Sequence, residues 1–469
     1  MTTPGQDPQP KTLWGKTLGA YAPSRVPAMA RQNYRFELTA AFFMPFLLTV
    51  FEGAVISVLV RIAFEDAVPD RLLNSITGLV AVSPALANLS SFIWVKLSHG
   101  VDKVRFMPTL PVVMAVMGSG IALVPLNEIG LIAVAVLVLG GRGCWAGVTT
   151  LRSAVWKQNY PDGARAKITG PFAMITVLTV AVLTAGMGVL MDYDDRAFRV
   201  IIPVGCALGL VGRHFWTKVR IRGGPRLLKS ESLTDARTGP SFNPVRMARV
   251  LTDDRAYAAF MLCQFLLGIG NILAMTLLAV ILREVFDAGY VVGLLVAVVI
   301  QYTVMPFAIP LWARLFDKTH IVRFRAIHSW VFVIALSTLL VAVQTQLVWL
   351  LFAFRALKGV AVGGGVLGWT LGHLDFAPPE KASQYMGVHV TLTGVRGLLA
   401  AALGVQMYEW FGGADGGAGP AVIVCLVCTT IGAIGFVIMD RALHRPQTHD
   451  DSARKEDAGP SSTPTGGGS

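Results

Sequence analysis

This 469-residue chain places a few ionisable side chains inside long apolar runs. Such a group costs at least about 2.5–3.5 kcal/mol in the centre of a bilayer, so its presence indicates a function. We therefore expect contacts with a substrate or a coupling ion from Glu52, Arg142, Arg355, Lys358 and Arg396. Further polar groups in the same runs could hydrogen-bond a substrate or simply join helices: Gln264, Asn271, Gln301, Tyr302 and His389.

Glu52 is the only acid that the apolar runs place deep inside a predicted helix. An apolar cavity favours the protonated form of a carboxyl group, which suits a proton carrier, whereas a nearby cation favours the ionised form. Arg142 is the expected partner. Two interpretations stay open: a proton-coupling or substrate-gated ion pair, or a static bridge between two helices.

The other candidate charges deep inside these runs, Arg142, Arg355, Lys358 and Arg396, are basic, so a cavity lined by them would carry net positive charge. Arginine is suited to bidentate contacts with carboxylate or phosphate groups. An anionic substrate, such as an organic acid or a phosphorylated metabolite, would supply the missing negative charge. This is a hypothesis about substrate class.

Enzymatic chemistry finds little support in the sequence. No Gly-x-x-x-x-Gly-Lys-Ser/Thr phosphate loop occurs, so ATP is not expected to drive transport. No Ser/His/Asp set is recognisable, and the five cysteines and the histidines show no metal-ligand spacing. We expect no catalytic residue, no cofactor and no metal ion.

The composition predicts the elements that carry these side chains. The chain is 54% hydrophobic and 14% charged, with a mean hydropathy of +0.60, whereas soluble proteins carry about 25% charged residues. A membrane-spanning helix needs about 20 apolar residues. Such runs occur near 38–62, 73–97, 106–124, 128–152, 168–191, 198–217, 256–282, 288–313, 326–344, 347–371, 386–410 and 419–440.

An internal repeat relates the two halves of the chain. Trp94–Phe106 recurs at Trp312–Phe324, with Trp, Leu, Val, Arg and Phe matching at an offset of 218 residues. Both copies end one predicted helix and form the loop to the next. The sequence therefore predicts an all-α membrane protein of twelve transmembrane helices in two parallel six-helix repeats.

Lysine and arginine counts predict the orientation. With the N-terminus inside, the cytoplasmic segments hold 30 Lys and Arg residues and the outer loops hold 5. This bias follows the positive-inside rule, so the +12 net charge needs no nucleic-acid partner. We expect a multi-pass protein of the cell (inner) membrane, without a cleaved signal peptide and with both termini cytoplasmic.

The same pattern divides the chain into segments. We expect a cytoplasmic N-terminal segment, a six-helix bundle, a basic cytoplasmic linker, a second six-helix bundle and a disordered cytoplasmic tail. Their predicted ranges are 1–36, 37–217, 218–255, 256–440 and 441–469.

This organisation resembles the major facilitator superfamily of secondary transporters. That family carries Gly-x-x-x-Asp-Arg/Lys-x-Gly-Arg-Arg/Lys in its 2–3 loop. Here Asp102, Lys103 and Arg105 fit loosely, whereas Ser98 replaces the first Gly and Arg105 stands in place of the second. The resemblance implies a central cavity between the halves and a latch on the cytoplasmic face. We assign the latch to Asp102, Lys103, Arg105, Asp317, Lys318 and Arg323, although the basic groups could equally be topology charges only.

We therefore expect a monomeric secondary active transporter that moves a small solute, such as an organic anion, by alternating access with proton coupling through Glu52. Two alternatives remain open. One is an exporter of hydrophobic or cationic compounds, although the Gly-Pro signature late in helix 5 that marks drug/proton antiporters is absent. The other is a transporter-like receptor or assembly factor that moves no solute.

Overall fold

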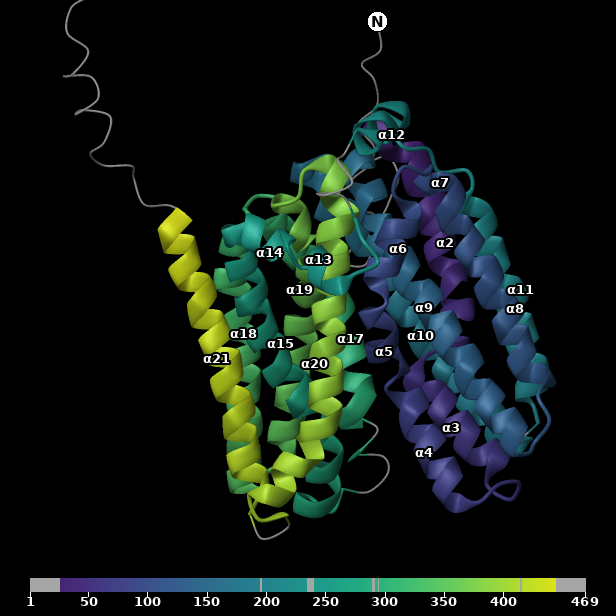
Figure 1. Cartoon of the computed structure of the whole chain (residues 1–469). Helices are drawn as coiled ribbons and strands as arrows, with labels where there is room; N and C mark the ends of the chain where they lie inside the picture. The colour runs from purple at the N-terminus through teal and green to yellow at the C-terminus, as the bar shows by residue number, and fades with distance from the viewer. Residues whose placement is uncertain are drawn as a thin grey trace, which may run out of the picture.

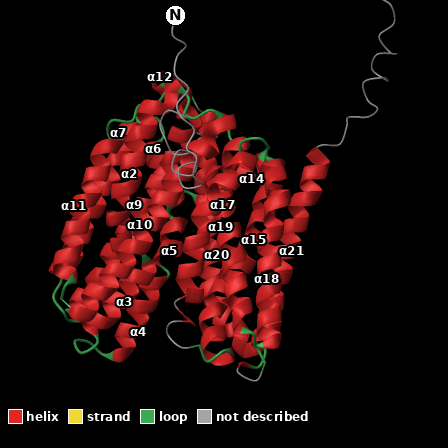
Figure 2. Ribbon diagram, turned by 180° about the vertical axis from the view of Figure 1, so that it is seen from behind, coloured by secondary structure: helices red, strands yellow, loops and turns green. Residues whose placement is uncertain are grey.

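The computed structural model is built of helices arranged in two side-by-side bundles (Figures 1 and 2). It describes residues 26–194, 196–233, 240–288, 292–293, 295–413 and 416–443. Within these ranges, nine helical segments are long and apolar enough to cross a membrane, counted by length and composition. The predicted terminal segments lie largely outside the described residues.

Nine of the twelve predicted runs correspond to these segments. The one from Lys103 to Leu123 consists of α7 (Lys103–Phe106), a 3-10 turn and α8 (Leu110–Leu123). The others are built on α9 (Glu128–Asn159), α10 (Arg165–Tyr193), α11 (Phe198–Trp216), α15 (Arg255–Val280), α18 (Ile321–Thr345), α19 (Val348–Leu371), α20 (Ala382–Trp410) and α21 (Ala418–Leu443).

The other three runs are interrupted, contrary to the continuous helices expected. The first consists of α2 (Arg31–Val50) and α3 (Gly53–Phe64). The second consists of α4 (Asp70–Ala81), α5 (Ser83–Leu89) and α6 (Ser91–Ser98), with a 55° bend between α4 and α5. The eighth is α17 (Ile300–Phe316), preceded by a π-helical turn over Leu295–Val299.

The first two interruptions face each other, which gives a physical reason for them. Pro84 lies in the first turn of α5, where its missing N–H is tolerated. A Cβ atom on Gly53 would lie only 2.5 Å from the Ala81 carbonyl oxygen. The broken chain therefore lets the start of α3 approach the bend of α4 more closely than a side chain would allow.

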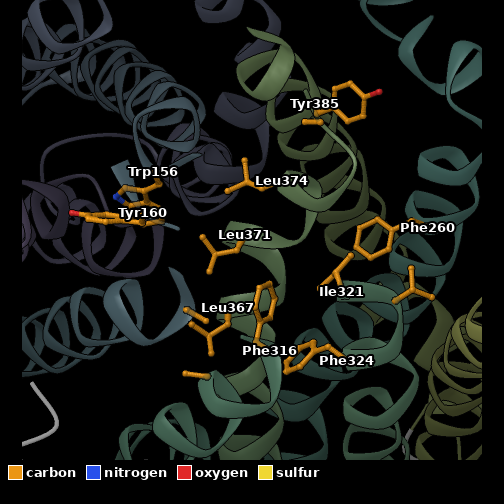
Figure 3. Packing of buried hydrophobic residues seen from close by; sticks show 14 of the residues in the cluster. Trp156, Tyr160, Phe260, Phe316, Ile321, Phe324, Leu367, Leu371, Leu374 and Tyr385 are labelled. Atoms are coloured by element: carbon orange, nitrogen blue, oxygen red, sulfur yellow. The ribbon is translucent and has the colours of Figure 1, made fainter. Parts of the chain in front are cut away.

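Each bundle has its own apolar core, and a third cluster joins them. One core lies between Ala40 and Val219, and another lies between Ile269 and Cys425. The joining cluster brings Trp156 and Tyr160 of α9 against Leu371 and Leu374 at the end of α19 (Figure 3). The bundles are thus packed on one another through apolar side chains as well as polar ones.

The segment between the bundles lies at one end of the molecule. It forms α12 (Gly224–Ser232), α13 (Pro244–Met247) and α14 (Val250–Asp253), although no apolar run predicted helices there. We call the end that carries α7 and α12 the linker face (Figure 1). The bundles contact one another below it, where α20 packs on α5, α6 and α9, and α10 packs on α17.

Candidate functional site

The break between α2 and α3 positions Glu52 as the residue that precedes α3. Its Oε2 atom lies 3.2 Å from Nη1 of Arg142 on α9, so the expected contact between these residues is present. The Glu52 side chain is 37% exposed and that of Arg142 is 11% exposed. The carboxylate of this ion pair is therefore partly exposed, whereas the guanidinium is largely covered.

Two residues of the C-terminal bundle approach this ion pair. The hydroxyl of Tyr302 on α17 interacts electrostatically with both Glu52 and Arg355. Arg355 is buried on α19, and its Nη1 donates a hydrogen bond to the sulfur of Met275 at 3.1 Å. Tyr302 is thus the residue through which the Glu52–Arg142 pair and Arg355 are connected electrostatically.

Lys358 continues this group one helical turn further along α19. Its ammonium group donates a hydrogen bond to the side-chain oxygen of Asn271 and lies 5.1 Å from the Phe332 ring centroid. Arg355 is close enough to interact with it electrostatically. Within the described part of the chain, no carboxylate lies within ion-pair distance of Lys358, which is only 3% exposed.

Arg396 lies elsewhere in the C-terminal bundle. Its guanidinium donates to the backbone oxygen of Gln264 at 2.6 Å and to the Thr393 hydroxyl at 3.1 Å. Gln264 therefore contributes its backbone rather than its side chain. The side-chain oxygens of Gln264 and Gln301 and both ring nitrogens of His389 are buried without a hydrogen-bond partner.

A second ion pair between the first and fourth predicted spans was missed. Glu37 is 2% exposed and accepts hydrogen bonds from Arg152 at 3.3 Å, from the Trp156 indole at 2.6 Å and from the Tyr160 hydroxyl at 2.8 Å. The expectation that Glu52 is the only deep acid is therefore wrong. Helix α2 begins at Arg31, seven residues before the predicted run, so Glu37 was counted outside.

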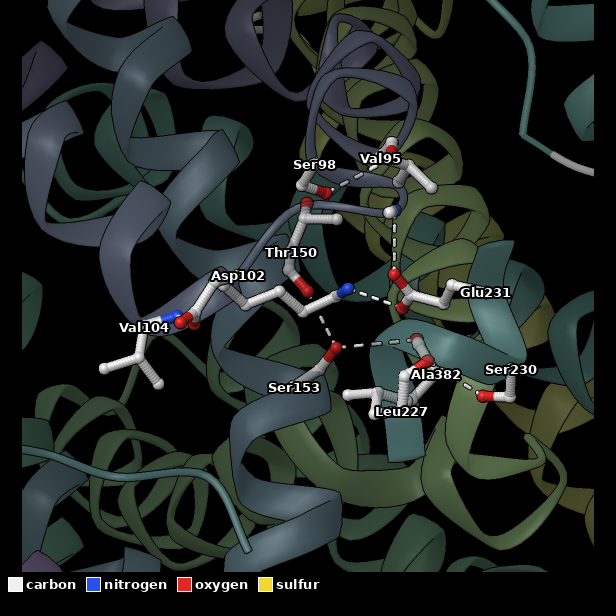
Figure 4. A network of polar contacts seen from close by, with 12 residues as sticks. Val95, Ser98, Asp102, Val104, Thr150, Ser153, Leu227, Ser230, Glu231 and Ala382 are labelled. Carbon is white, nitrogen blue, oxygen red and sulfur yellow. Dashed lines mark hydrogen bonds and ion pairs between the residues drawn. The ribbon is translucent and has the colours of Figure 1, made fainter. Parts of the chain in front are cut away.

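The linker face contains a buried ion pair that involves the predicted latch residue Lys103. Its ammonium lies 2.5 Å from Glu231 of α12, and both side chains are 3% exposed. The other Glu231 oxygen accepts from the Gly100 amide at 2.9 Å (Figure 4). Burial lowers the pKa of neighbouring His99, against the opposing effect of Glu231. Thus Lys103 ties the 2–3 loop to the linker, not directly to the other bundle.

Asp317 is the latch candidate that contacts the opposite bundle. Its two oxygens accept from the amides of Ala166 at 2.8 Å and Lys167 at 2.9 Å, at the start of α10. A carboxylate in this position is favoured by the helix dipole. Burial raises the pKa of Asp317, and these amide donors oppose the rise.

The remaining latch candidates make local contacts. Asp102 accepts from the Val104 amide at the start of α7 and forms a 3.5 Å ion pair with Arg105, which is 89% exposed. Arg323 pairs with Asp440 of the same bundle at 3.3 Å, and Lys318 is exposed. Among the described residues, Asp317 is the one latch candidate of the six whose polar contacts cross directly between the bundles.

Solved structures with this arrangement are transporters. The chain matches the proton:xylose symporter XylE with a TM-score of 0.66 and 13% identity over 86% of this chain and 95% of that one. It matches a bacterial homologue of the iron transporter ferroportin with a TM-score of 0.67 and 12% identity over 87% and 99%. The human organic anion transporter MFSD10 gives 0.60 and 14% over 87% and 100%.

The chain therefore has the fold of the major facilitator superfamily transporters, as the loop signature and the repeat predicted. No protein-family model and no curated protein sequence matches it. At these identities the likeness establishes the fold, and the substrate has to be argued from the side chains.

Proposed function

We propose that this protein is a monomeric secondary active transporter that moves a small organic anion across the cell membrane by alternating access. The observation that carries the substrate class is the environment of Lys358. It is buried on α19, bonded to the neutral Asn271 and close to a second cation, Arg355. A carboxylate or phosphate group beside Lys358 would neutralise its buried charge, and such charge-assisted hydrogen bonds are strong.

Coupling to protons follows from the partly exposed ion pair. When Glu52 takes up a proton on its carboxylate, it loses its charge, and the 3.2 Å contact with Arg142 weakens. The guanidinium is then free to attract an anion. Proton binding and anion binding would thus favour each other, which is the thermodynamic requirement for moving them together.

Alternating access would use the contacts at the linker face, which we assign to the cytoplasmic side together with both termini. Asp317 at the start of α10 and the packing of α20 on α5, α6 and α9 hold this face closed. Rocking of the two bundles about the midplane would break these contacts and expose the anion to the cytoplasm.

Flux into proteoliposomes tests the proposal. Radiolabelled lactate, succinate and glucose 6-phosphate are offered with and without an inward proton gradient, beside xylose and a quaternary ammonium cation. We expect saturable anion uptake that Lys358→Gln abolishes and that Arg314→Gln, an exposed charge at the end of α17, leaves intact. Uptake of only the neutral or cationic solute, or no flux at all, contradicts the proposal.

A further inference from the structure

A second group of buried basic side chains lies inside the C-terminal bundle, on the linker side of Lys358. It consists of Arg325 on α18 and of His389 and Arg396 on α20, which are 1%, 0% and 5% exposed. Arg396 bonds to Gln264, whereas Lys358 bonds to Asn271, seven residues further along α15. The Arg396 guanidinium lies between the Gln264 carbonyl and Gly268, so at 1.5 Å per residue it is about 5–10 Å from Asn271 along α15.

The charged neighbours that act on this group are positive. Arg325 interacts with Arg396, and His389 interacts with both guanidinium groups and with His373. No acid of the described ranges contributes at either guanidinium. Their hydrogen-bond partners are neutral: a ring nitrogen of His328 for Arg325, and a carbonyl and a hydroxyl for Arg396. A buried ion without a counter-charge costs several kcal/mol.

The group also contains buried nitrogen atoms that lack a hydrogen-bond partner among the described residues. The Nε atoms of Arg325 and Arg396 and both ring nitrogens of His389 are buried without a hydrogen-bond partner. Each buried donor left unpaired costs about 1–3 kcal/mol, and more when it is charged. An oxyanion accepts several hydrogen bonds and also carries the missing charge, so one ligand would remove both penalties.

The helices are shaped to hold the two guanidinium groups inside. A Cβ atom on Gly268 would lie 2.0 Å from Nη1 of Arg396, and one on Gly368 would lie 2.6 Å from the central carbon of Arg325. Each arginine therefore occupies space that a larger residue would fill. This placement is a built feature of the bundle and not the result of a side chain folding back from the surface.

A route connects this group with the other bundle. The His373 ring lies 6.4 Å from that of His389, centroid to centroid, and interacts electrostatically with Arg165 and Lys157 of the N-terminal bundle. Lys157 itself donates to the Leu374 carbonyl across the interface. The contacts of His373 therefore extend from His389 to the interface between the bundles.

We propose that Arg325, His389 and Arg396 form a second oxyanion site, which binds a carboxylate or phosphate group after the linker face opens. In the transport cycle proposed above, on which this role rests, an anion that leaves Lys358 reaches Arg396 next. Binding itself requires no transport and can be measured on the detergent-solubilised full chain.

Equilibrium dialysis of the purified chain with radiolabelled phosphate, and separately with radiolabelled succinate, tests the site. Chloride is kept constant and in excess, so that only oxyanion-specific binding is counted. The variants are Lys358→Gln, Arg396→Gln, Arg325→Gln, the double variant of the first two, and Arg314→Gln as the exposed control. Arg396→Lys keeps the charge without the guanidinium fork, and thermal unfolding shows that each variant is folded.

We expect the wild type and Arg314→Gln to bind two oxyanions, Lys358→Gln and Arg396→Gln one each, and the double variant none. Arg325→Gln should weaken the second site at least about tenfold, because a charged hydrogen bond contributes about 1.5–3 kcal/mol. Arg396→Lys should retain part of that affinity, which separates loss of charge from misfolding. Comparison of the Kd values for phosphate and succinate shows which of the two oxyanion classes the second site prefers.

The two proposals fail differently in this experiment. If Lys358→Gln alone removes all binding, the second site is wrong and the proposed substrate class stands. If Arg396→Gln leaves the stoichiometry unchanged, the second site is also wrong. If the wild type binds neither oxyanion, the second site fails together with the anion hypothesis.

Discussion

Arg152 in the N-terminal bundle, with a side chain 15% exposed, and Arg396 in the C-terminal bundle, 5% exposed, have different partners. Arg152 lies against the carboxylate of Glu37, which also accepts from Trp156 and Tyr160. Arg396 donates only to a carbonyl and a hydroxyl. Similar contrasts separate Arg142, which has Glu52, from Lys358, which has Asn271.

This difference indicates that the buried cations of the two bundles have different roles. In the N-terminal bundle Arg142 and Arg152 each have a carboxylate partner, so these two pairs can fix helix positions or exchange a proton. In the C-terminal bundle the charges of Lys358 and Arg396 are balanced by no carboxylate that the structure describes. Because an uncompensated buried charge is costly, this side is where an anionic solute would gain most.

The largest expected effect on stability comes from breaking the Glu37–Arg152 ion pair. Glu37→Gln leaves Arg152 buried without a counter-charge, which we expect to lower the free energy of unfolding by about 3–5 kcal/mol. Thermal unfolding in detergent measures it. Arg396→Gln is the matched control: it removes an uncompensated charge, so stability without ligand should stay equal or rise. Equal destabilisation by both variants would contradict the contrast between the bundles.

The buried pair at the linker face should give the next largest effect. Glu231→Gln leaves Lys103 with a neutral partner, and charged hydrogen bonds contribute about 1.5–3 kcal/mol. We expect a loss of this size and a looser linker face. Spin-label distances between α12 and the start of α20 would report the loosening; an unchanged distance distribution would show that this pair does not hold the linker in place.

Glu52→Gln should change coupling more than stability. The Glu52 side chain is 37% exposed, so we expect a stability change within about 1 kcal/mol. Gradient-driven accumulation in proteoliposomes should be lost, because a glutamine at position 52 cannot take up and release the coupled proton. Solute exchange without a gradient should persist. Full retention of accumulation would remove Glu52 from the coupling role.

The smallest effect is expected at the most exposed pair. Arg105→Gln removes an ion pair with Asp102 in which the arginine is 89% exposed. Such pairs contribute about 0–1 kcal/mol, so stability and transport should stay close to wild type. A marked loss of transport would instead show that Arg105 contacts something in another conformation of the cycle.

The sequence was sufficient for the fold because hydropathy, the repeat at an offset of 218 residues and the charge bias all follow from the bilayer. It also pointed to Arg142 as the neighbour of Glu52, at 3.2 Å in the structure. It could not place Glu37, because helix ends are poorly defined by hydropathy and α2 starts before the apolar run.

Other features depend on tertiary packing that no local pattern reveals. Nothing near Phe51 predicts that α2 stops there, since the break is fitted to the bend between α4 and α5. Arg325 and Arg396 meet from helices far apart in the sequence. Glu231 looked like one polar residue of a polar linker, yet it is buried against Lys103.

The contrast between the bundles is tested most directly by anion affinity in two variants at pH 8. The ligand is the radiolabelled anion with the highest uptake in the liposome assay, and dialysis gives its Kd. We predict that Lys358→Gln raises Kd about 10- to 100-fold, the value of one charged hydrogen bond, whereas Arg142→Gln, whose charge Glu52 already neutralises, raises it threefold or less. Equal losses in the two variants would contradict the account.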